Sequence, residues 1–188
     1  MSRQRRQLRS MIVLASTSPQ RKAILEQLRI PFEIVAPTYE EAGDDPVEHA
    51  VGKARSVDGG GSLVLGVDTV VVLDGAVLGK PADDAEARSM LDRLAGRTHE
   101  VVSGICLRTA EWEEVGRAVT AVTFRQLAAH EIVDYVASGE WEGRAGGYAI
   151  QGYGASLVER IEGDYLNVVG LPVALLLGAL SRAPKTRG

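Results

Sequence analysis

Asp68 is an acidic residue inside an otherwise apolar stretch, within the segment Gly66-Val67-Asp68-Thr69. A buried carboxylate without a partner is costly, so Asp68 is expected to be paired, bound to a metal ion or catalytic. The other interpretation is a structural carboxylate that accepts hydrogen bonds from neighbouring backbone amides. Both interpretations follow from this segment taken alone.

Hydroxyl and cationic side chains gather between an apolar run and a helical pattern, in Ser16-Thr-Ser-Pro-Gln-Arg-Lys22. The free amides and the positive dipole end of a helix N-terminus favour an anion at such a place. Ser18 is expected to cap the first turn, and Pro19 suits the first helical position. The alternative is a helix cap followed by solvated charges. The segment is not a Walker phosphate loop, because no Gly-Lys-Ser or Gly-Lys-Thr follows a spaced glycine.

Two lysines and a glycine-rich segment complete the set of chemical motifs. Lys53 lies in Ala50-Val-Gly-Lys-Ala54 on an expected helix, and Lys80 precedes Pro81; in isolation each is interpreted as a solvated surface charge. Five glycines within residues 143–154 would let the backbone approach a ligand closely, while Gln151 offers both a donor and an acceptor. This segment has the character of a loop that reads a base, and an irregular turn fits it equally well.

Apolar periodicity predicts the strands and helices that position these motifs. The predicted strands cover residues 11–15, 32–36, 63–67 with 69–73, 76–78, 99–108 and 115–125. The predicted helices follow Ser18, surround Lys53, follow a capping pair at Asp83 and Glu86, surround Ile132 to Val136, and begin at Pro172. Asp74-Gly75 predicts a hairpin turn, and Gly96 and Gly139 are expected to end helices. Interspersed strands and helices with hairpins predict an α/β fold with a mixed sheet.

Length and charge exclude several classes of protein. With 188 residues, 45% hydrophobic, the chain suits one globular domain, expected over residues 11–182 between flexible tails at 1–10 and 183–188. A net charge of −4 argues against a nucleic-acid polymer as partner. The basic start is followed by too few apolar residues for a signal or membrane anchor, and Met11 is a second possible start. The single cysteine, Cys106, is expected to be buried in a strand, which suits a reducing, cytoplasmic compartment.

Taken in order, the motifs resemble those of the Maf family. The matching segments are Leu14-Ala-Ser-Thr-Ser-Pro-Gln-Arg21, Gly66-Val-Asp-Thr69, Gly79-Lys-Pro81, Leu94-Ala-Gly-Arg-Thr-His-Glu-Val101, Ala145-Gly-Gly-Tyr-Ala-Ile-Gln-Gly152 and Val168-Val-Gly-Leu-Pro172. The resemblance implies a single domain with an elongated mixed sheet flanked by helices, similar to inosine triphosphatase, commonly in a homodimer. It also implies hydrolysis of a nucleoside triphosphate to the monophosphate and pyrophosphate.

The resemblance assigns roles to individual residues. It makes Asp68 the general base and places Asp68 and Glu41 at a Mg²⁺ or Mn²⁺ ion. The residues that it implies for substrate binding are Ser16, Ser18, Gln20, Arg21, Lys53, Thr69, Lys80 and Gln151. Gln20 stands where the family has its first arginine, and it is either a weakened phosphate contact or a solvent-facing substitution. The stretch before Lys53 is short relative to the family pattern.

The segment Tyr148-Ala-Ile-Gln151 resembles the sequence at this position in the branch of the family that acts on dTTP and UTP. Two alternatives stay open from the sequence. One is the branch that acts on 7-methyl-GTP, and the other is a nucleotide-binding regulator of septum formation and cell division. The intact set of Asp68, Lys53 and Lys80 favours an enzyme over a regulator. No membrane partner is expected.

Overall fold

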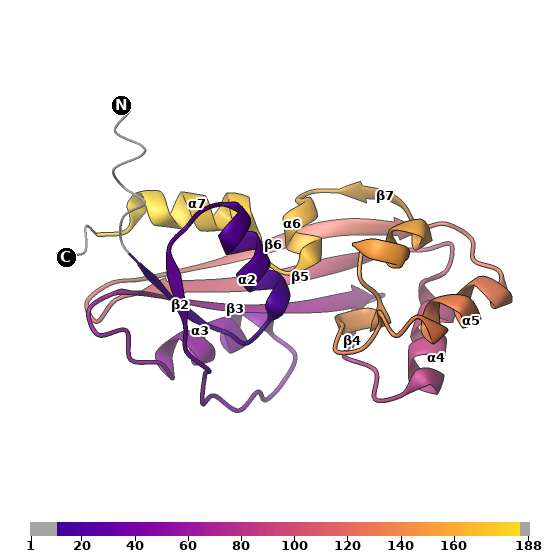
Figure 1. Ribbon diagram of the computed structural model, residues 1–188, viewed down its shortest axis with the longest axis horizontal. Coiled ribbons are helices and arrows are strands. Elements are labelled where there is room, and N and C mark those ends of the chain that lie inside the picture. The colour runs from indigo at the N-terminus through magenta and orange to yellow at the C-terminus, as the bar shows by residue number, and fades with distance from the viewer. Residues whose placement is uncertain (1–10, 185–188) are drawn as a thin grey trace. The chain divides into compact units, whose positions relative to one another are not determined.

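The computed structural model describes residues 11–184, and within this range strands and helices are interspersed along the chain (Figure 1). The strands are β1 (Ile12–Ala15), β2 (Phe32–Ile34), β3 (Leu63–Leu73), β4 (Ala76–Leu78), β5 (Thr98–Arg108), β6 (Glu113–Phe124) and β7 (Val158–Glu162). The helices are α2 (Pro19–Gln27), α3 (Pro46–Arg55), α4 (Asp84–Leu94), α5 (Ala129–Ala137), α6 (Tyr165–Val169) and α7 (Val173–Arg182), with short 3₁₀ turns η1 (Ala145–Gly147) and η2 (Gly152–Leu157).

The strands of the described range form a seven-stranded mixed sheet. Its order is β2-β1-β3-β5-β6-β7, and β4 pairs with β3. β1 is parallel to both β2 and β3, with Ile12 opposite Phe32 and Leu63, whereas the pairs β3–β4 and β6–β7 are antiparallel. The prediction of a mixed sheet in an α/β fold is confirmed.

The turn between β3 and β4 follows the prediction from its two residues. Asp74 and Gly75 both have positive φ, at 53° and 78°. Two consecutive residues in the left-handed region make the tight hairpin turn that Asp-Gly favours. As a result, Val71 pairs with Leu78 directly after the segment that carries Asp68.

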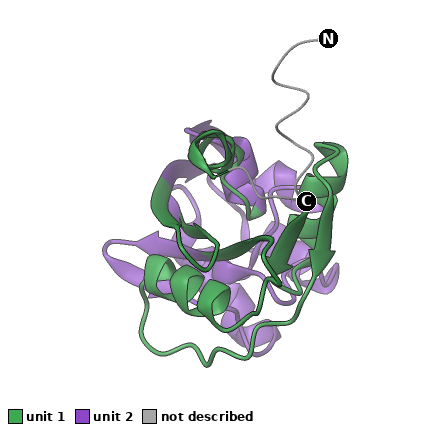
Figure 2. Ribbon diagram, turned by 90° about the vertical axis from the view of Figure 1, so that its left-hand side faces the viewer, with its two compact units in different colours: residues 1–68, 103–118, 170–188 green, residues 69–102, 119–169 purple. Residues whose placement is uncertain are grey.

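The chain forms two compact units (Figure 2). Unit 1 combines residues up to Asp68 with residues 103–118 and residues from Gly170 onward, and unit 2 contains residues 69–102 and 119–169. Strands β3, β5 and β6 each contribute residues to both units. The last residue of the first segment of unit 1 is Asp68, and unit 2 begins at Thr69.

In unit 1, helix α3 packs closely on the sheet. A core cluster consists of Val13, Ala15, Ala50, Ala54, Val57, Val64 and Cys106. The closest approach is at Gly66 of β3, where an added Cβ would lie 2.1 Å from the Ala50 carbonyl oxygen and 2.8 Å from the Ala54 amide nitrogen. A side chain larger than hydrogen at position 66 would therefore push α3 away from the strand.

Unit 2 has its own core, built on α4 and α5. Asp83 caps α4 by accepting a hydrogen bond from the Glu86 amide at 2.9 Å, and Gly96 follows the helix with φ of 67°. Fully buried Phe124 meets the His99 and Tyr148 rings edge to face. Aromatic and aliphatic packing of this kind can hold the unit together without a disulfide.

Most predicted elements are confirmed, and several expectations need correction. Ser18 takes the N-cap position of α2, but its side chain does not cap the helix; its hydroxyl lies 3.0 Å from Gln20 Oε1 instead. The helix predicted around Ile132 to Val136 is confirmed as α5, with Val133 on its exposed side at 43% exposure. Strand β7 and helix α6 were not predicted. The tail expected at residues 1–10, and most of that expected at 183–188, lies outside the described residues.

None of the helices described between residues 11 and 184 is both long enough and apolar enough to span a membrane.

Candidate active site

Asp68 lies on β3 with 8% of its surface exposed, and its carboxylate is bonded to side chains. One oxygen, Oδ1, accepts a hydrogen bond from Lys53 Nζ at 2.6 Å, and the other, Oδ2, lies 3.3 Å from His49 Nδ1. Both partners come from α3, one turn of helix apart. The expectation that Asp68 is buried and paired is confirmed.

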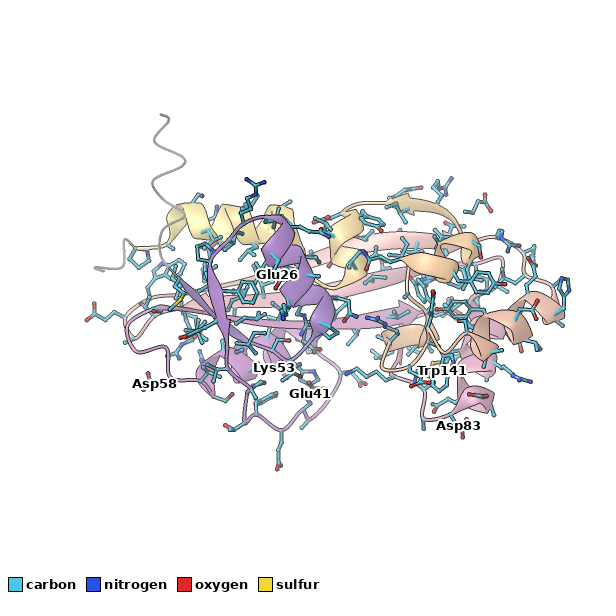
Figure 3. All side chains as sticks on the ribbon, viewed as in Figure 1. Glu26, Glu41, Lys53, Asp58, Asp83 and Trp141 are labelled. Atoms are coloured by element: carbon cyan, nitrogen blue, oxygen red, sulfur yellow. The ribbon has the colours of Figure 1, made fainter. Side chains whose placement is uncertain are left out.

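Lys53 joins two carboxylates. Its ammonium group lies 2.6 Å from Asp68 Oδ1 and 2.5 Å from Glu41 Oε1, while the Glu41 side chain remains half exposed (Figure 3). The sequence taken alone favoured a solvated Lys53, and this was wrong, because only 8% of the residue is exposed. The close packing of α3 on β3 brings the lysine under the surface, where two carboxylates compensate the cost of burial.

The loop that carries Glu41 is fixed against α3 by Tyr39. An added Cβ at Gly52 would lie 2.2 Å from Tyr39 Cε2, so the tyrosine ring lies directly over this glycine. Asp45 then caps α3 by accepting a hydrogen bond from the Val47 amide at 2.8 Å, and Pro46 occupies the first turn. These contacts place the loop that carries Glu41 alongside α3, where the Glu41 carboxylate reaches Lys53.

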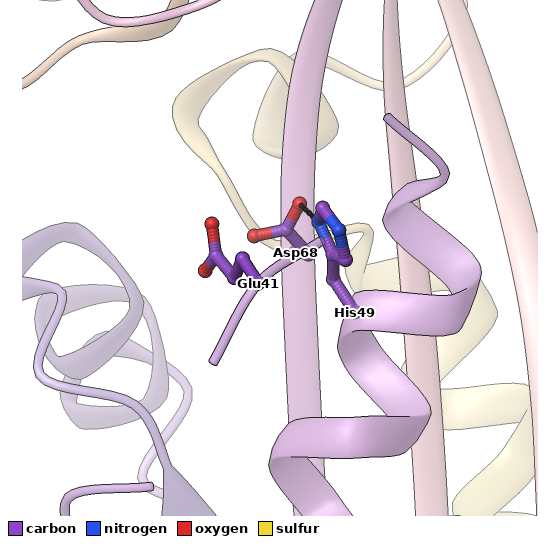
Figure 4. A group of neighbouring side chains, drawn as sticks. All are labelled: Glu41, His49 and Asp68. Atoms are coloured by element: carbon purple, nitrogen blue, oxygen red, sulfur yellow. Dashed lines mark hydrogen bonds and ion pairs between the residues drawn. The ribbon is translucent and has the colours of Figure 1, made fainter. Parts of the chain in front are cut away.

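His49 is the residue of this cluster that the sequence reasoning missed. It is 4% exposed and lies beside Asp68 (Figure 4). Its second ring nitrogen, Nε2, lies 3.3 Å from the Ala42 carbonyl oxygen. The available signal was the spacing of His49 and Lys53, because residues four apart lie on the same face of a helix.

Arg21 and Ser16 form a second polar group in unit 1. Arg21 donates hydrogen bonds from Nη1 to Ser16 Oγ at 2.9 Å and from Nε to the Gly170 carbonyl at 3.0 Å. Burial lowers the pKa of Arg21, while the charges of Asp68 and Glu41 act in the opposite direction. A guanidinium remains charged under such conditions, so Arg21 is a fixed buried cation.

The other predicted substrate residues divide between the units. Ser18 and Gln20 are half-buried at the start of α2 and bond to each other. Thr69, Lys80 and Gln151 belong to unit 2, where Lys80 and Gln151 are exposed, as the interpretation of Lys80 as a surface charge predicted. The structure thus brings Glu41, Lys53 and Asp68 together and adds His49.

The glycine-rich segment of unit 2 is shaped by glycine conformation and by one carboxylate. Gly143, Gly146, Gly147 and Gly152 all have positive φ, which favours glycine. Glu140 accepts hydrogen bonds from the Tyr153 and Gly154 amides at 2.9 and 3.0 Å and thereby fixes the chain just after Gln151. Tyr148 is anchored by a 2.8 Å hydrogen bond to His99 Nε2, and burial lowers the pKa of this histidine to about 4.

Carboxylate, imidazole, ammonium and guanidinium groups thus lie within one unit. Glu41, His49 and Asp68 each offer one ligand atom, and these atoms lie within 4.8 Å of one another. Such a donor set can hold a divalent cation, and fixed cations beside it can neutralise phosphate oxygens. The site therefore has the composition of a metal-assisted centre for anionic substrates.

The chain belongs to the Maf family. The model of this family, described as Maf-like protein, matches residues 11–183. A relative from Symbiobacterium thermophilum named dTTP/UTP pyrophosphatase is 47% identical over 171 residues, covering 86% of this chain and 88% of the relative. Two further relatives have the same name. The one from Nitratidesulfovibrio vulgaris is 47% identical, covering 91% of this chain and 87% of the relative, and the one from Pyrococcus furiosus is 41% identical, covering 94% of this chain and 97% of the relative.

Proposed function

We propose that this chain is a nucleotide pyrophosphatase that hydrolyses dTTP and UTP to the nucleoside monophosphate and pyrophosphate. The observation that carries the proposal is the buried contact of Asp68 with Lys53, next to Glu41 and His49, in a member of the Maf family. Relatives at 41–47% identity bear the name of this activity.

In the proposed reaction Asp68 orients a water molecule and accepts its proton as the water attacks the α-phosphorus. The bond from that phosphorus to the bridging oxygen breaks, and pyrophosphate leaves. Arg21 and Lys53 counter the charge of the phosphates from unit 1, and Lys80 is proposed to contribute to phosphate binding as well. Positioning and charge neutralisation account for most of the catalysis of phosphate transfer, so fixed cations suit this role.

A divalent cation, Mg²⁺ or Mn²⁺, is proposed as the cofactor. Asp68 and Glu41 would hold it, and their carboxylate oxygens are the ligands that both ions accept. When bound, such an ion supplies charge stabilisation and acidifies water. Lys53 already bridges the same two carboxylates, which indicates that this place in the fold is built for positive charge.

The first test is a panel of nucleoside triphosphates. We expect pyrophosphate release from dTTP and UTP with Mg²⁺ or Mn²⁺, and its loss with chelator, because the charge stabilisation and the positioning of water would be lost together. Release measured from the natural nucleotides and from 7-methyl-GTP checks this. Preference for 7-methyl-GTP would place the chain in the other branch, and binding without turnover would make it a nucleotide-binding regulator.

Gln151 and Thr69 are proposed to take part in base selection. Replacing Gln151 with glutamate should weaken the use of dTTP and UTP, because a carboxylate would face a pyrimidine carbonyl oxygen. One such unsatisfied contact corresponds to about 1 to 3 kcal/mol, or roughly 5- to 150-fold in kcat/KM. Kinetics with pyrimidine and purine triphosphates check this. Equal losses for all of them would mean that Gln151 supports the loop and does not read the base.

The family resemblance also suggests the fold type, the oligomeric state and the location of the protein. We propose the inosine triphosphatase type of fold, a homodimer and a cytoplasmic location. The mixed α/β sheet supports the proposed fold. The single cysteine, Cys106, is free and buried, which fits a reducing compartment.

A further inference from the structure

We propose that His49 is a third ligand of the divalent cation, through Nδ1, and that the site therefore favours ions that accept nitrogen, such as Mn²⁺ and Co²⁺, over Mg²⁺. This inference rests on the proposed metal-dependent hydrolysis and deepens it. It adds a residue that the sequence motifs did not contain, and it names the chemical class of the ion.

The first argument is the hydrogen bonding of the imidazole. Nε2 lies 3.3 Å from the Ala42 carbonyl oxygen, and Nδ1 lies 3.3 Å from Asp68 Oδ2. Both the carbonyl and the carboxylate oxygens only accept, and a neutral imidazole has one N–H to donate. In the tautomer that donates from Nε2 to Ala42, the Nδ1 lone pair faces a carboxylate oxygen. Two lone-pair atoms at this distance need a positive centre between them, and either a proton or a metal ion supplies it.

The bond to Ala42 is also the contact that a metal-bound histidine makes. Histidine ligands donate their other ring N–H to a backbone carbonyl or a carboxylate, which fixes the tautomer and the orientation of the ring. The His49 side chain is 5% exposed, and the Tyr39 ring lies 6.1 Å away between centroids. The ring is thus held in place before any ion enters.

The second argument is the separation of the donor atoms. His49 Nδ1 and Asp68 Oδ2 are 3.3 Å apart, so both atoms could contact one ion placed between them. Asp68 can provide Oδ2 while Oδ1 keeps its bond to Lys53. Glu41 is within reach and half exposed, so its side chain has room to adjust.

A nitrogen ligand from His49 would change the relative affinity of the site for different divalent ions. Mg²⁺ prefers oxygen ligands and keeps much of its hydration. Among first-row divalent ions, affinity for a site with nitrogen and oxygen ligands rises from Mn²⁺ to Co²⁺, so an imidazole should favour Co²⁺ most and Mn²⁺ less strongly. Compared with a site made of carboxylates alone, a site with one imidazole and two carboxylates should therefore bind Mn²⁺ and Co²⁺ more tightly relative to Mg²⁺.

Pulsed electron paramagnetic resonance of the full chain with Mn²⁺ alone, in a buffer without nitrogen, tests the ligand directly. We expect a ¹⁴N coupling in the native protein, retained in His130→Asn and absent in His49→Asn. His130 is an exposed histidine of α5, so it provides a matched control. An absent coupling in the native protein, or one that persists in His49→Asn, would overturn the proposal, and the native measurement needs no variant to fold.

Metal affinity separates ligation from positioning. Asparagine can still donate a hydrogen bond to Asp68, so it would rescue a residue that only positions the carboxylate. If His49 is a ligand, His49→Asn and His49→Leu should both lose at least about 10- to 100-fold in Mn²⁺ affinity by calorimetry, with a much smaller change for Mg²⁺. Equal losses for the two ions would overturn the proposal. Pyrophosphate release without nitrogen coupling would refute this inference alone, whereas coupling without release from any nucleotide would refute the proposed function.

Discussion

Asp68→Asn should lower kcat/KM for dTTP and UTP by at least about 10²- to 10⁴-fold, the contribution typical of a general base. Asparagine keeps the size of the side chain but can neither accept the proton nor carry the charge that holds a cation. Lys53 retains Glu41 at 2.5 Å, so the substitution does not leave the buried ammonium without a partner. The loss should therefore fall on activity, with the fold retained.

Steady-state kinetics and thermal unfolding of the same preparations check this expectation. Asp58→Asn is a matched control, because Asp58 is exposed and its contact is with the Gly60 amide, which asparagine can also bond (Figure 3). The control should keep native activity. Retention of most activity by Asp68→Asn would show that another group activates the water.

Gly66→Ala should destabilise the fold by about 3 kcal/mol or more, since inserting atoms into a packed core typically costs about 1 to 3 kcal/mol and here the neighbour is backbone. The new Cβ would meet the Ala50 carbonyl oxygen at 2.1 Å, so α3 must move as a body. For a chain of this size, Tm should fall by roughly 6 to 12 °C. His49 and Lys53 are on the same helix, so activity should fall as well.

Gly79→Ala provides the comparison, because nothing lies within 4 Å of an added Cβ there and no positive φ is required. It should change Tm by no more than a few degrees. Differential scanning calorimetry of both variants decides the matter. A Gly66→Ala protein with native Tm and activity would contradict the close packing of α3 on β3.

The parts of the fold that the sequence predicted are those with strong local signals. The Asp74-Gly75 turn, the Asp83 cap and the helix end at Gly96 each depend on a few neighbouring residues, and all are confirmed. β7 was missed because it is a polar edge strand with no buried residue. α6 has only five residues, which is too short for helical periodicity to show.

The same distinction between local and long-range signals applies to the residues of the candidate site. The burial of Asp68 could be predicted, because the apolar residues around it are adjacent in the sequence. The burial of Lys53 could not, since it depends on contact between α3 and Gly66, 13 positions away and visible only in three dimensions. His49 carried too weak a signal by itself, and its meaning depends on Asp68 of another element.

The buried Cys106 of β5 can report when the packing between α3 and the sheet in unit 1 opens. The thiol is fully enclosed beside Ala50 and Ala54 of α3, and burial raises its pKa to about 12. The thiolate is the reactive form, so alkylating reagents must wait until unit 1 opens. Because the sequence has a single cysteine, the labelling rate follows the opening of the layer between α3 and the sheet without interference from a second thiol.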